Sequence, residues 1–306
     1  MDSNTFWKKL IFLCFCLVIL DFSIGKVLEF LYFKQKKGKL YNVTYVLEQQ
    51  TCDVLVLGSS KAMHQYNPKI ISDSLNLSCY NAGYDGQGIL YSKAVLDVVI
   101  ERYIPKVIIL DIVSIEFCVT FNTSYDMLHV LNPYAKKHPV LWETLSLKSK
   151  TERIKHFSSI YPYNSMPARI IAGLLPGETK DVTEDGFTPQ FGIWNEEIKE
   201  TIYADSKLDE NKTKAFEDIY RICSENNISL YVVVSPIFSI IPNKTISFLH
   251  LEQTCRDLNI PFFNFVNDKD YLDNELFLDI DHLNSQGADI FSKDLSHKIL
   301  NFKQNH

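Results

Sequence analysis

Short apolar runs alternate with stretches of helical spacing along most of the chain. The apolar runs, which predict buried β-strands, lie at 53–58, 77–83, 106–113, 228–236 and 261–266. The stretches that predict helices lie at 89–103, 207–226, 245–258 and 285–300. Strands that alternate with helices pair in parallel through right-handed crossovers. The pattern therefore predicts an α/β fold, a three-layer α/β/α sandwich around a five-stranded parallel sheet.

The segment at about 116–206 breaks this rhythm. It is rich in proline, glycine and aromatic residues, as in "YPYNSMPARIIAGLLPGE". Its length of about 90 residues is far beyond that of an ordinary connection between two elements. We therefore predict an insertion between the third and fourth strands, which forms a lid or a substrate-binding cap.

The N-terminus carries a different apolar pattern. Eleven apolar residues, Leu10–Leu20, follow two lysines, and after Asp21 the apolar pattern resumes as far as Phe33. A membrane span needs about 20 apolar residues. The run reaches that length only if Asp21 is tolerated near the far headgroups. The persistence of the pattern favours a single-pass signal anchor, which would export the rest of the chain.

Two alternatives remain for this segment. A basic start, a short apolar core and the small residues Ser23 and Gly25 also fit a cleaved signal peptide. A core helix of a soluble protein is the other alternative. The basic run at 34–39 opposes the positive-inside rule for an exported domain. The favoured division is an anchor at 1–34 and a folded domain at 35–306.

Composition excludes several classes of protein. The chain has 306 residues, 46% of them hydrophobic and 22% charged, which is typical of a globular protein. Its net charge of −6 gives no basic field for nucleic acid, so no nucleic-acid partner is expected. The seven cysteines are scattered and odd in number, which argues against a disulfide framework, although one bridge stays open. No motif indicates a metal or a cofactor, and we expect none.

Two adjacent serines follow the first predicted strand. Gly58 ends that strand, and Ser59 and Ser60 stand where the next helix begins. The first N–H groups of a helix are unpaired and carry a positive partial charge. A serine there can cap the helix, or it can be a nucleophile whose oxyanion those N–H groups stabilise. Taken alone, Ser60 is open to both interpretations.

A histidine follows the last predicted strand, at the same carboxyl edge of the sheet. In "FLDIDHLNSQGA", Asp279 precedes His282 by three residues. That spacing on a turn lets the carboxylate accept a hydrogen bond from Nδ1, which fixes the tautomer of a general base. The alternatives are a solvated turn that caps the last helix, or metal binding by Asp279 and Asp281, for which no third ligand suggests itself.

A glycine-rich loop follows the second predicted strand. The segment "YNAGYDGQG" brings Gly83, Gly86 and Gly88 to the same edge. Glycine lets a backbone N–H approach a reacting oxygen closely, although a loop that needs positive φ would select glycine as well.

These three motifs, in this order and at these places, resemble the SGNH (GDSL-type) hydrolase superfamily, whose sheet is flavodoxin-like. The resemblance implies that Ser60 is the nucleophile, and that His282 and Asp279 complete a catalytic triad. It also implies an oxyanion hole formed by the backbone N–H groups of Ser60 and Gly86. It covers roughly 50–115 and 207–300.

One family motif is missing. The third block, Gly-x-Asn-Asp, should follow the third strand, where the sequence reads "DIVS" and Val113 stands in place of the asparagine. Loss of one such oxyanion donor lowers the rate by about 10²–10³. The chain is similar in this respect to exported relatives that modify surface polymers. Asn81, Gly83 and Asp111 lie at the same edge and are candidate substrate-binding residues.

The sequence thus predicts a membrane-anchored, extracytoplasmic serine hydrolase or acyltransferase. Its substrate would be an acylated cell-surface glycan or a small ester, with a membrane acyl-transfer protein as a candidate partner. The alternative is a catalytically weak or inactive relative that binds glycan or scaffolds a polymer-modification complex. A third interpretation is a nucleotide-binding domain that uses "GSSKA" as a phosphate loop. The sequence lacks the glycine spacing that such a loop requires.

Overall fold

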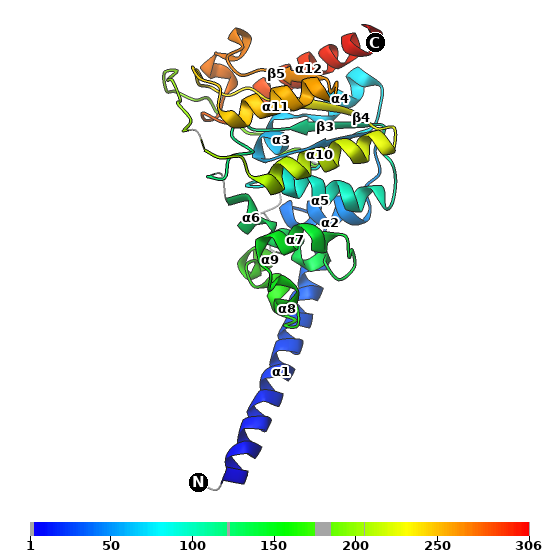
Figure 1. The fold of residues 1–306 in the computed structure, drawn as a ribbon, viewed down its shortest axis with the longest axis vertical. Coiled ribbons are helices and arrows are strands. Elements are labelled where there is room, and N and C mark those ends of the chain that lie inside the picture. The colour runs from blue at the N-terminus through cyan, green and yellow to red at the C-terminus, as the bar shows by residue number, and fades with distance from the viewer. Residues whose placement is uncertain (1–2, 121–122, 175–184, 205, 306) are drawn as a thin grey trace. The chain divides into compact units, whose positions relative to one another are not determined.

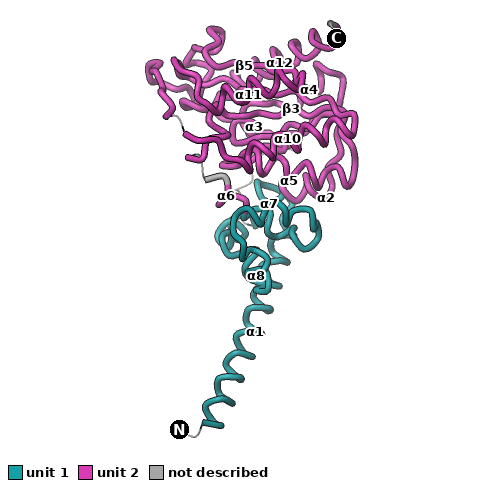
Figure 2. Tube along the Cα trace, viewed as in Figure 1, with its two compact units in different colours: residues 1–41, 129–180 teal, residues 42–128, 181–306 magenta. Residues whose placement is uncertain are grey.

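The computed structural model describes residues 3–120, 123–174, 185–204 and 206–305. The chain divides into two compact units (Figure 2). The first comprises residues 1–41 and 129–180, and the second comprises residues 42–128 and 181–306. The predicted division at residues 34 and 35 stays a prediction.

The second unit is built on one parallel sheet. Its strands are β1 (Val54–Leu57), β2 (Cys79–Asn81), β3 (Val107–Asp111), β4 (Ser229–Val234) and β5 (Phe262–Asn264). Their order in the sheet is β2-β1-β3-β4-β5, and every neighbouring pair is parallel. This order confirms the predicted α/β fold with five parallel strands. The long insertion lies between β3 and β4.

The central strands are buried on both faces. Every residue of β1 and β3 is buried, and both strands consist of valine, isoleucine and leucine until Asp111. Continuous apolar strands of this kind occur in parallel sheets because helices cover both faces. Their β-branched side chains also favour the extended backbone.

Helices cover the two faces of this sheet, as Figure 1 shows. The helices of the second unit are α3 (Ser60–Gln65), α4 (Pro68–Leu75), α5 (Ile89–Ile100), α6 (Thr123–Met127), α10 (Glu210–Glu225), α11 (Ile246–Asp257), α12 (Ser285–Asn305) and the short 3₁₀ helices η3 (Lys269–Tyr271) and η4 (Asn274–Leu276). Helix α12 packs against α3 and α4, and α5 packs against α10. The division between the two units along the chain falls within helix α2 (Lys39–Glu48), after Tyr41.

A buried cluster joins α3, α4 and α12 to one face of the sheet. Val56 and Ile109 from the strands meet Tyr66, the C-cap residue of α3, and Phe291 and Leu295 from α12. All five side chains are almost fully shielded from solvent. Burial of each such side chain contributes about 1.5–3 kcal/mol, so the last helix is an integral part of the core that carries the site.

The turn after β1 requires glycine. Gly58 has a φ of +151°, and a Cβ there would lie 2.9 Å from the carbonyl oxygen of Asp111 and 2.9 Å from the Cβ of Ala62. A larger residue would therefore push β1 away from β3 or from α3. The turn brings the N-terminus of α3 directly over the carboxyl edge of the sheet, where ligands bind in folds of this type.

The first unit is helical. Its elements are α1 (Ser3–Phe33), η1 (Leu128–Tyr134), α7 (Leu141–Lys148), α8 (Glu152–Lys155), η2 (Tyr161–Tyr163) and α9 (Pro167–Ala172). By length and composition α1 qualifies as a membrane anchor or as a signal sequence, with a mean hydropathy of 2.3 and few buried residues. The other helices of this unit come from the predicted insertion.

Candidate active site

The two adjacent serines have different roles at the start of α3. Ser59 is the N-cap, and its hydroxyl accepts a hydrogen bond from the backbone N–H of Lys61 at 3.3 Å. Ser60 is the first residue of the helix, so its own hydroxyl is not used for capping. The sequence left Ser60 open as a cap or a nucleophile, and the structure places the capping contact on Ser59.

The structure brings Ser60, His282 and Asp279 into one hydrogen-bonded chain. Ser60 Oγ lies 2.8 Å from His282 Nε2, and His282 Nδ1 lies 3.0 Å from both carboxylate oxygens of Asp279. Asp279 Oδ1 also accepts from the backbone N–H groups of Asp281 and His282, at 2.8 and 2.9 Å. A carboxylate held in this way keeps the proton on Nδ1 and leaves Nε2 free to accept from Ser60.

Asp279 stays ionised in this environment. Partial burial raises the pKa of its carboxyl, but hydrogen bonds from the His282 side chain and from the two backbone N–H groups outweigh burial, and the net pKa lies below the ordinary value. The negative charge is therefore present at neutral pH. It faces the ring that would gain a proton if His282 acted as a base.

The serine and the histidine open into a cavity of about 330 Å³. Its lining consists of Ser59, Ser60, Lys61, Gly86, Gln87, Val113, Ser114, Ile115, Tyr203, Ile237, Asp281 and His282. The residues that follow β1, β2, β3 and β4 thus meet at one edge of the sheet. Tyr203 belongs to the predicted insertion, which supplies one wall.

Gly86 and Val113 both lie in the wall of this cavity. Gly86 has a φ of +69°, and a Cβ there would lie 2.9 Å from the Cε of Met127. The loop is held by Gln87, whose side chain donates to the carbonyl oxygen of Met127 at 2.8 Å. Val113 occupies the place at which the resemblance predicts an asparagine, and its side chain offers no donor.

Asn81 and Gly83 have partners of their own. The Asn81 amide donates to the carbonyl oxygens of Ala62 and Tyr66, at 2.7 and 2.8 Å, and accepts from the Gly83 N–H at 2.9 Å. A Cβ on Gly83 would lie 2.5 Å from the backbone nitrogen of Met63. Both residues bind the loop after β2 to α3, so we infer that they help to position Ser60. Their predicted contact with substrate stays a prediction.

Asp111 is also engaged beneath the site. One of its oxygens accepts from the Tyr66 hydroxyl at 2.7 Å and from the backbone N–H of Ser235 at 3.3 Å. Burial raises the pKa of the Asp111 carboxyl, although the positive charge of Lys61 opposes that shift. These contacts tie the end of β3 to α3 and β4. Substrate binding by Asp111 stays a prediction as well.

Sequence reasoning gave no role to Lys61 and His64, which both lie on α3. Lys61 is buried in the cavity wall, where burial lowers the pKa of its ammonium group and the charges of Asp281, Asp111 and Asp279 raise it. His64 lies between Asp85, at 3.0 Å, and the carbonyl oxygen of Thr188, at 2.7 Å.

The ring of His64 meets that of His282 edge-on, with centroids 5.4 Å apart. One signal for His64 was present in the sequence, because it stands four residues after Ser60 and therefore shares its helix face.

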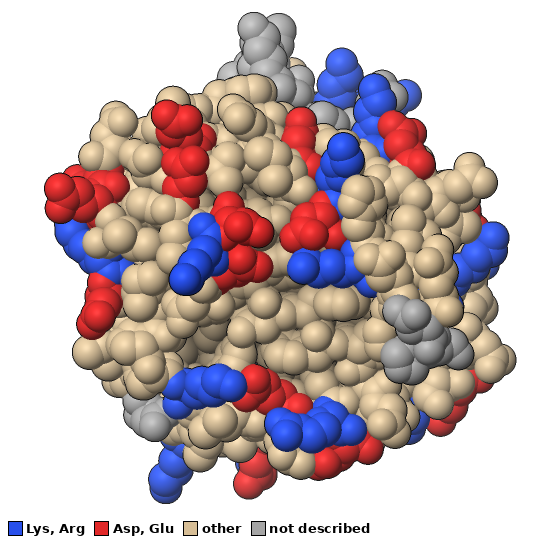
Figure 3. Space-filling model, turned by 90° about the horizontal axis from the view of Figure 1, so that it is seen from above, with Lys and Arg blue, Asp and Glu red and all other residues tan. Residues whose placement is uncertain are grey.

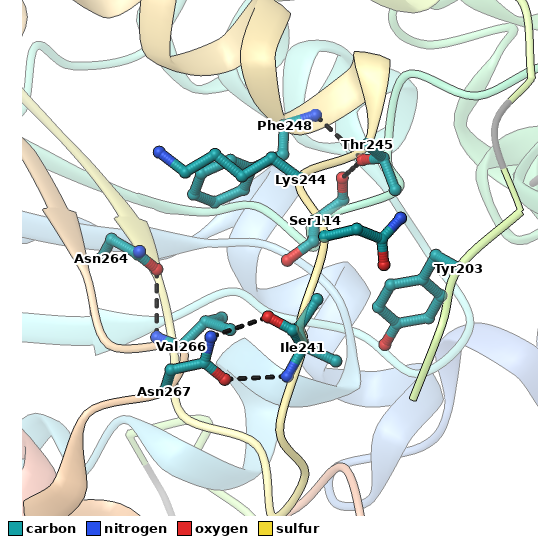
Figure 4. Close-up of a pocket in the computed structure, with 10 residues that line it drawn as sticks. Ser114, Tyr203, Ile241, Lys244, Thr245, Phe248, Asn264, Val266 and Asn267 are labelled. Carbon is teal, nitrogen blue, oxygen red and sulfur yellow. Dashed lines mark hydrogen bonds between the residues drawn. The ribbon is translucent and has the colours of Figure 1, made fainter. Parts of the chain in front are cut away.

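A smaller pocket adjoins the cavity, and Ser114 and Tyr203 line both (Figure 4). Its wall is fixed by Asn267, whose amide accepts from the N–H of Ile241 and donates to its carbonyl oxygen, each at 2.8 Å. The Oδ1 of Asn243 is buried there without a hydrogen-bond partner among the described residues. Sequence reasoning did not identify this pocket, because its lining comes from distant segments.

Charge and metal-binding groups are dispersed in the described parts of the chain. On the face seen in Figure 3, basic and acidic side chains are interspersed. No group of three or more His, Cys, Asp or Glu side chains is placed to hold a metal ion within the described residues. All seven cysteines are free, and four of them are buried.

Comparison with solved structures finds distant similarity. One similar chain is a candidate lipolytic protein of the G-D-S-L family from Desulfitobacterium hafniense DCB-2, with 12% identity and a TM-score of 0.38 over 80% of this chain and 98% of that one. Another is a candidate acylhydrolase from Bacteroides fragilis NCTC 9343, with 11% identity and a TM-score of 0.38 over 87% and 100%. No family model and no curated protein matches. Similarity this low does not decide an activity, so the function proposed below rests on the geometry of the site.

Proposed function

We propose that this protein is a serine hydrolase that cleaves acyl esters. The observation that carries the proposal is the contact chain from Ser60 Oγ through His282 to Asp279, with distances of 2.8 and 3.0 Å. A nucleophile, a base and a group that orients the base, all within hydrogen-bond reach, are the requirements of acyl transfer through a covalent intermediate. Ser60 and His282 line a cavity that is large enough for a small acyl group and part of an alcohol.

The first half of the reaction forms an acyl-enzyme. Ser60 Oγ attacks the carbonyl carbon of the ester while its proton passes to His282 Nε2. The carboxylate of Asp279 stabilises the imidazolium that results. The backbone N–H groups of Ser60 and Gly86 donate to the oxyanion of the tetrahedral intermediate. When the intermediate collapses, the ester C–O bond breaks and His282 returns the proton to the departing alcohol.

The second half releases the acyl group. A water molecule gives a proton to His282 Nε2 and attacks the acyl carbon, and the bond to Ser60 Oγ breaks as the proton returns to the serine. The products are the carboxylic acid and the free enzyme. If a sugar hydroxyl takes the place of water, the same steps transfer the acyl group to that hydroxyl. The choice of acceptor then decides between an esterase and an acyltransferase.

The proposed substrate is an acyl ester on a cell-surface glycan. Two features support it. Helix α1 has the length and composition of a membrane anchor or a signal sequence, which would bring the site near surface polymers. The aromatic wall at Tyr203 offers a face of the kind on which sugar rings stack. A membrane protein that delivers acyl groups is the partner this proposal implies.

A fluorophosphonate probe tests the proposal without a known substrate. The full chain should be labelled, Ser60→Ala should not be labelled, and Ser59→Ala should still be labelled. Loss of the Ser59 cap lowers stability by about 0.5–2 kcal/mol, so thermal unfolding of each variant controls for the fold. Absence of an adduct on Ser60 in a folded chain would refute the enzyme proposal.

Val113 supports a second candidate function. With the asparagine of the third block absent, the chain would be a weak or inactive relative that binds a glycan or scaffolds a modification complex. Under that proposal, the probe would not react with Ser60, whereas acetylated polysaccharide would bind. Binding by equilibrium dialysis, measured beside the labelling, separates the two functions.

A further inference from the structure

Helix α1 carries a carboxylate at a depth where a lone membrane helix has no partner for it. Hydrocarbon about 30 Å thick takes about 20 helical residues. A span that begins at Leu10, after two lysines, extends to about Glu29 and therefore includes Asp21. A charged group at such a depth is costly unless other protein groups bind it.

The partners of Asp21 come from the helical segment 129–174 of the same unit. The Ser158 hydroxyl donates to Asp21 at 2.5 Å, and the Ser159 backbone N–H donates to its other oxygen at 2.7 Å. One turn further along α1, Gly25 is buried against Ser159 so closely that a Cβ would overlap it. The turn at 158–159 is therefore fixed at the level of Asp21, and it satisfies both oxygens of the carboxylate.

Residues 153–159, here called the tip, present two exposed apolar side chains next to this contact. The side chain of Phe157 is 86% exposed and that of Ile154 is 63% exposed. The exposed Arg153 lies over the ring of Trp142, with 5.5 Å between the guanidinium carbon and the ring centroid. Exposed apolar side chains close in sequence to a cation that packs on a tryptophan are typical of segments that lie in a membrane interface.

Positions along α1 give the relative depths of the contacts that the rest of the unit makes with it. At the other end of the helical segment, Gly173 lies against the side chain of Gln35, two residues beyond the C-terminal end of α1. Lys26 and Lys136 line one cavity of about 280 Å³ against α1. Lys26 lies five residues, or about 7.5 Å, beyond Asp21. Helix α8 overlaps the start of the tip. Figures 1 and 2 show α8 beside α1, further toward the N-terminal end of α1 than α7 and α9.

We propose that the tip is inserted in the lipid bilayer beside α1. Lys26 and Lys136 lie near the end of this span, from which their long side chains reach the anionic headgroups, and the tip lies at the level of Asp21, about 7.5 Å deeper along α1. Phe157 and Ile154 then contact acyl chains, and Ser158 and Ser159 shield Asp21 from lipid. The membrane-embedded part of this protein is thus α1 together with the tip. This inference does not depend on the proposed esterase activity.

Fluorescent labels at matched positions test the proposal. The full chain, with Cys14→Ser and Cys16→Ser, is reconstituted in permeabilised vesicles of phosphatidylcholine and phosphatidylglycerol, and an environment-sensitive label is attached at Phe157→Cys or Ile154→Cys. The matched control is Ile171→Cys, which is 57% exposed in the same unit near Gly173. The unsubstituted background chain gives the blank for the other cysteines.

The expected result is a blue-shifted label at Phe157 and Ile154, quenched by lipid-borne nitroxide. Iodide in the water should quench these labels about fivefold less than the label at Ile171, because an inserted side chain leaves the aqueous phase. Equal iodide quenching at the three positions would overturn the proposal. So would a chain that does not remain with the vesicles, because α1 would then not span them.

Discussion

The substitution Asp279→Asn tests the proposed role of the carboxylate most directly. An asparagine has nearly the same shape, and its oxygen can still accept from the backbone N–H groups of Asp281 and His282 that Oδ1 now binds. Its NH₂ group would then face His282 Nδ1, in place of Oδ2 at 3.0 Å. A donor there favours the tautomer with the proton on Nε2, which cannot accept the proton of Ser60.

The expected loss of rate follows from the charge and the distance. The side chains of His282 and Asp279 are 22% and 39% exposed, so the pair is partly solvated. At 3.0 Å, an effective dielectric constant of about 20–40 gives about 2.8–5.5 kcal/mol between the carboxylate and an imidazolium. Each 1.36 kcal/mol is about tenfold in rate, which gives a loss of about 10²–10⁴ in kcat with little change in KM.

The rate constant of fluorophosphonate labelling measures this loss without the natural substrate, and hydrolysis of 4-nitrophenyl acetate gives kcat and KM. Asp257→Asn, which neutralises an exposed carboxylate elsewhere, should leave both rates unchanged. If Asp279→Asn reacts within about threefold of the parent chain while its thermal unfolding is unchanged, Asp279 does not stabilise a catalytic imidazolium, and the reasoning is wrong.

Three further predictions follow from particular contacts. Val113→Asn should raise the rate of ester hydrolysis by about tenfold or more, because one oxyanion donor is worth about 10²–10³; Val113→Leu, which adds no donor, is the control, and an equal rate in both variants would contradict the prediction. Gly83→Ala should lower the free energy of unfolding by about 1–3 kcal/mol, measured by urea titration, because its Cβ would lie 2.5 Å from a backbone nitrogen. Hydrogen bonds from Lys106 and Ser78 lower the pKa of Asp53 to about 2, from an ordinary value of 3.8. Asp53→Asn should therefore lower the free energy of unfolding by about 1 kcal/mol at neutral pH, after allowance for solvent screening at this partly exposed pair. Urea titrations at several pH values should show the difference between the two chains disappear as the pH falls from about 4 to 2, where the parent chain loses that contribution.

The central strands β1 and β3 could be predicted because they are buried on both faces and are almost unbroken apolar runs. The helices were found to within a few residues for a related reason. The predicted helix at 245–258 corresponds to α11, which begins after the N-cap Thr245, and the one at 207–226 corresponds to α10, whose N-cap Asp209 accepts from two backbone N–H groups. Both features are local, so the sequence near each element contains them.

The close approach of Ser60, His282 and Asp279 followed from the rule that parallel strands end at one edge, and the contacts agree with it. What could not be predicted depends on distant segments without periodicity. Tyr203 comes from the insertion and has no motif around it, yet it lines the cavity. The partners of Asp21 lie in the same insertion, 137 and 138 residues along the chain, so the sequence showed only an interrupted apolar run.

The distance along the chain between Ser60 and His282 has a consequence for synthesis. Ser60 and His282 are 222 residues apart, and the helix that follows His282 supplies Phe291 and Leu295 to the core beneath α3. A nascent chain that ends before this helix contains Ser60 but has no histidine held against it. The proposed ester-cleaving centre would therefore form only when nearly the whole chain has been made and folded, and incomplete or degraded copies would lack it.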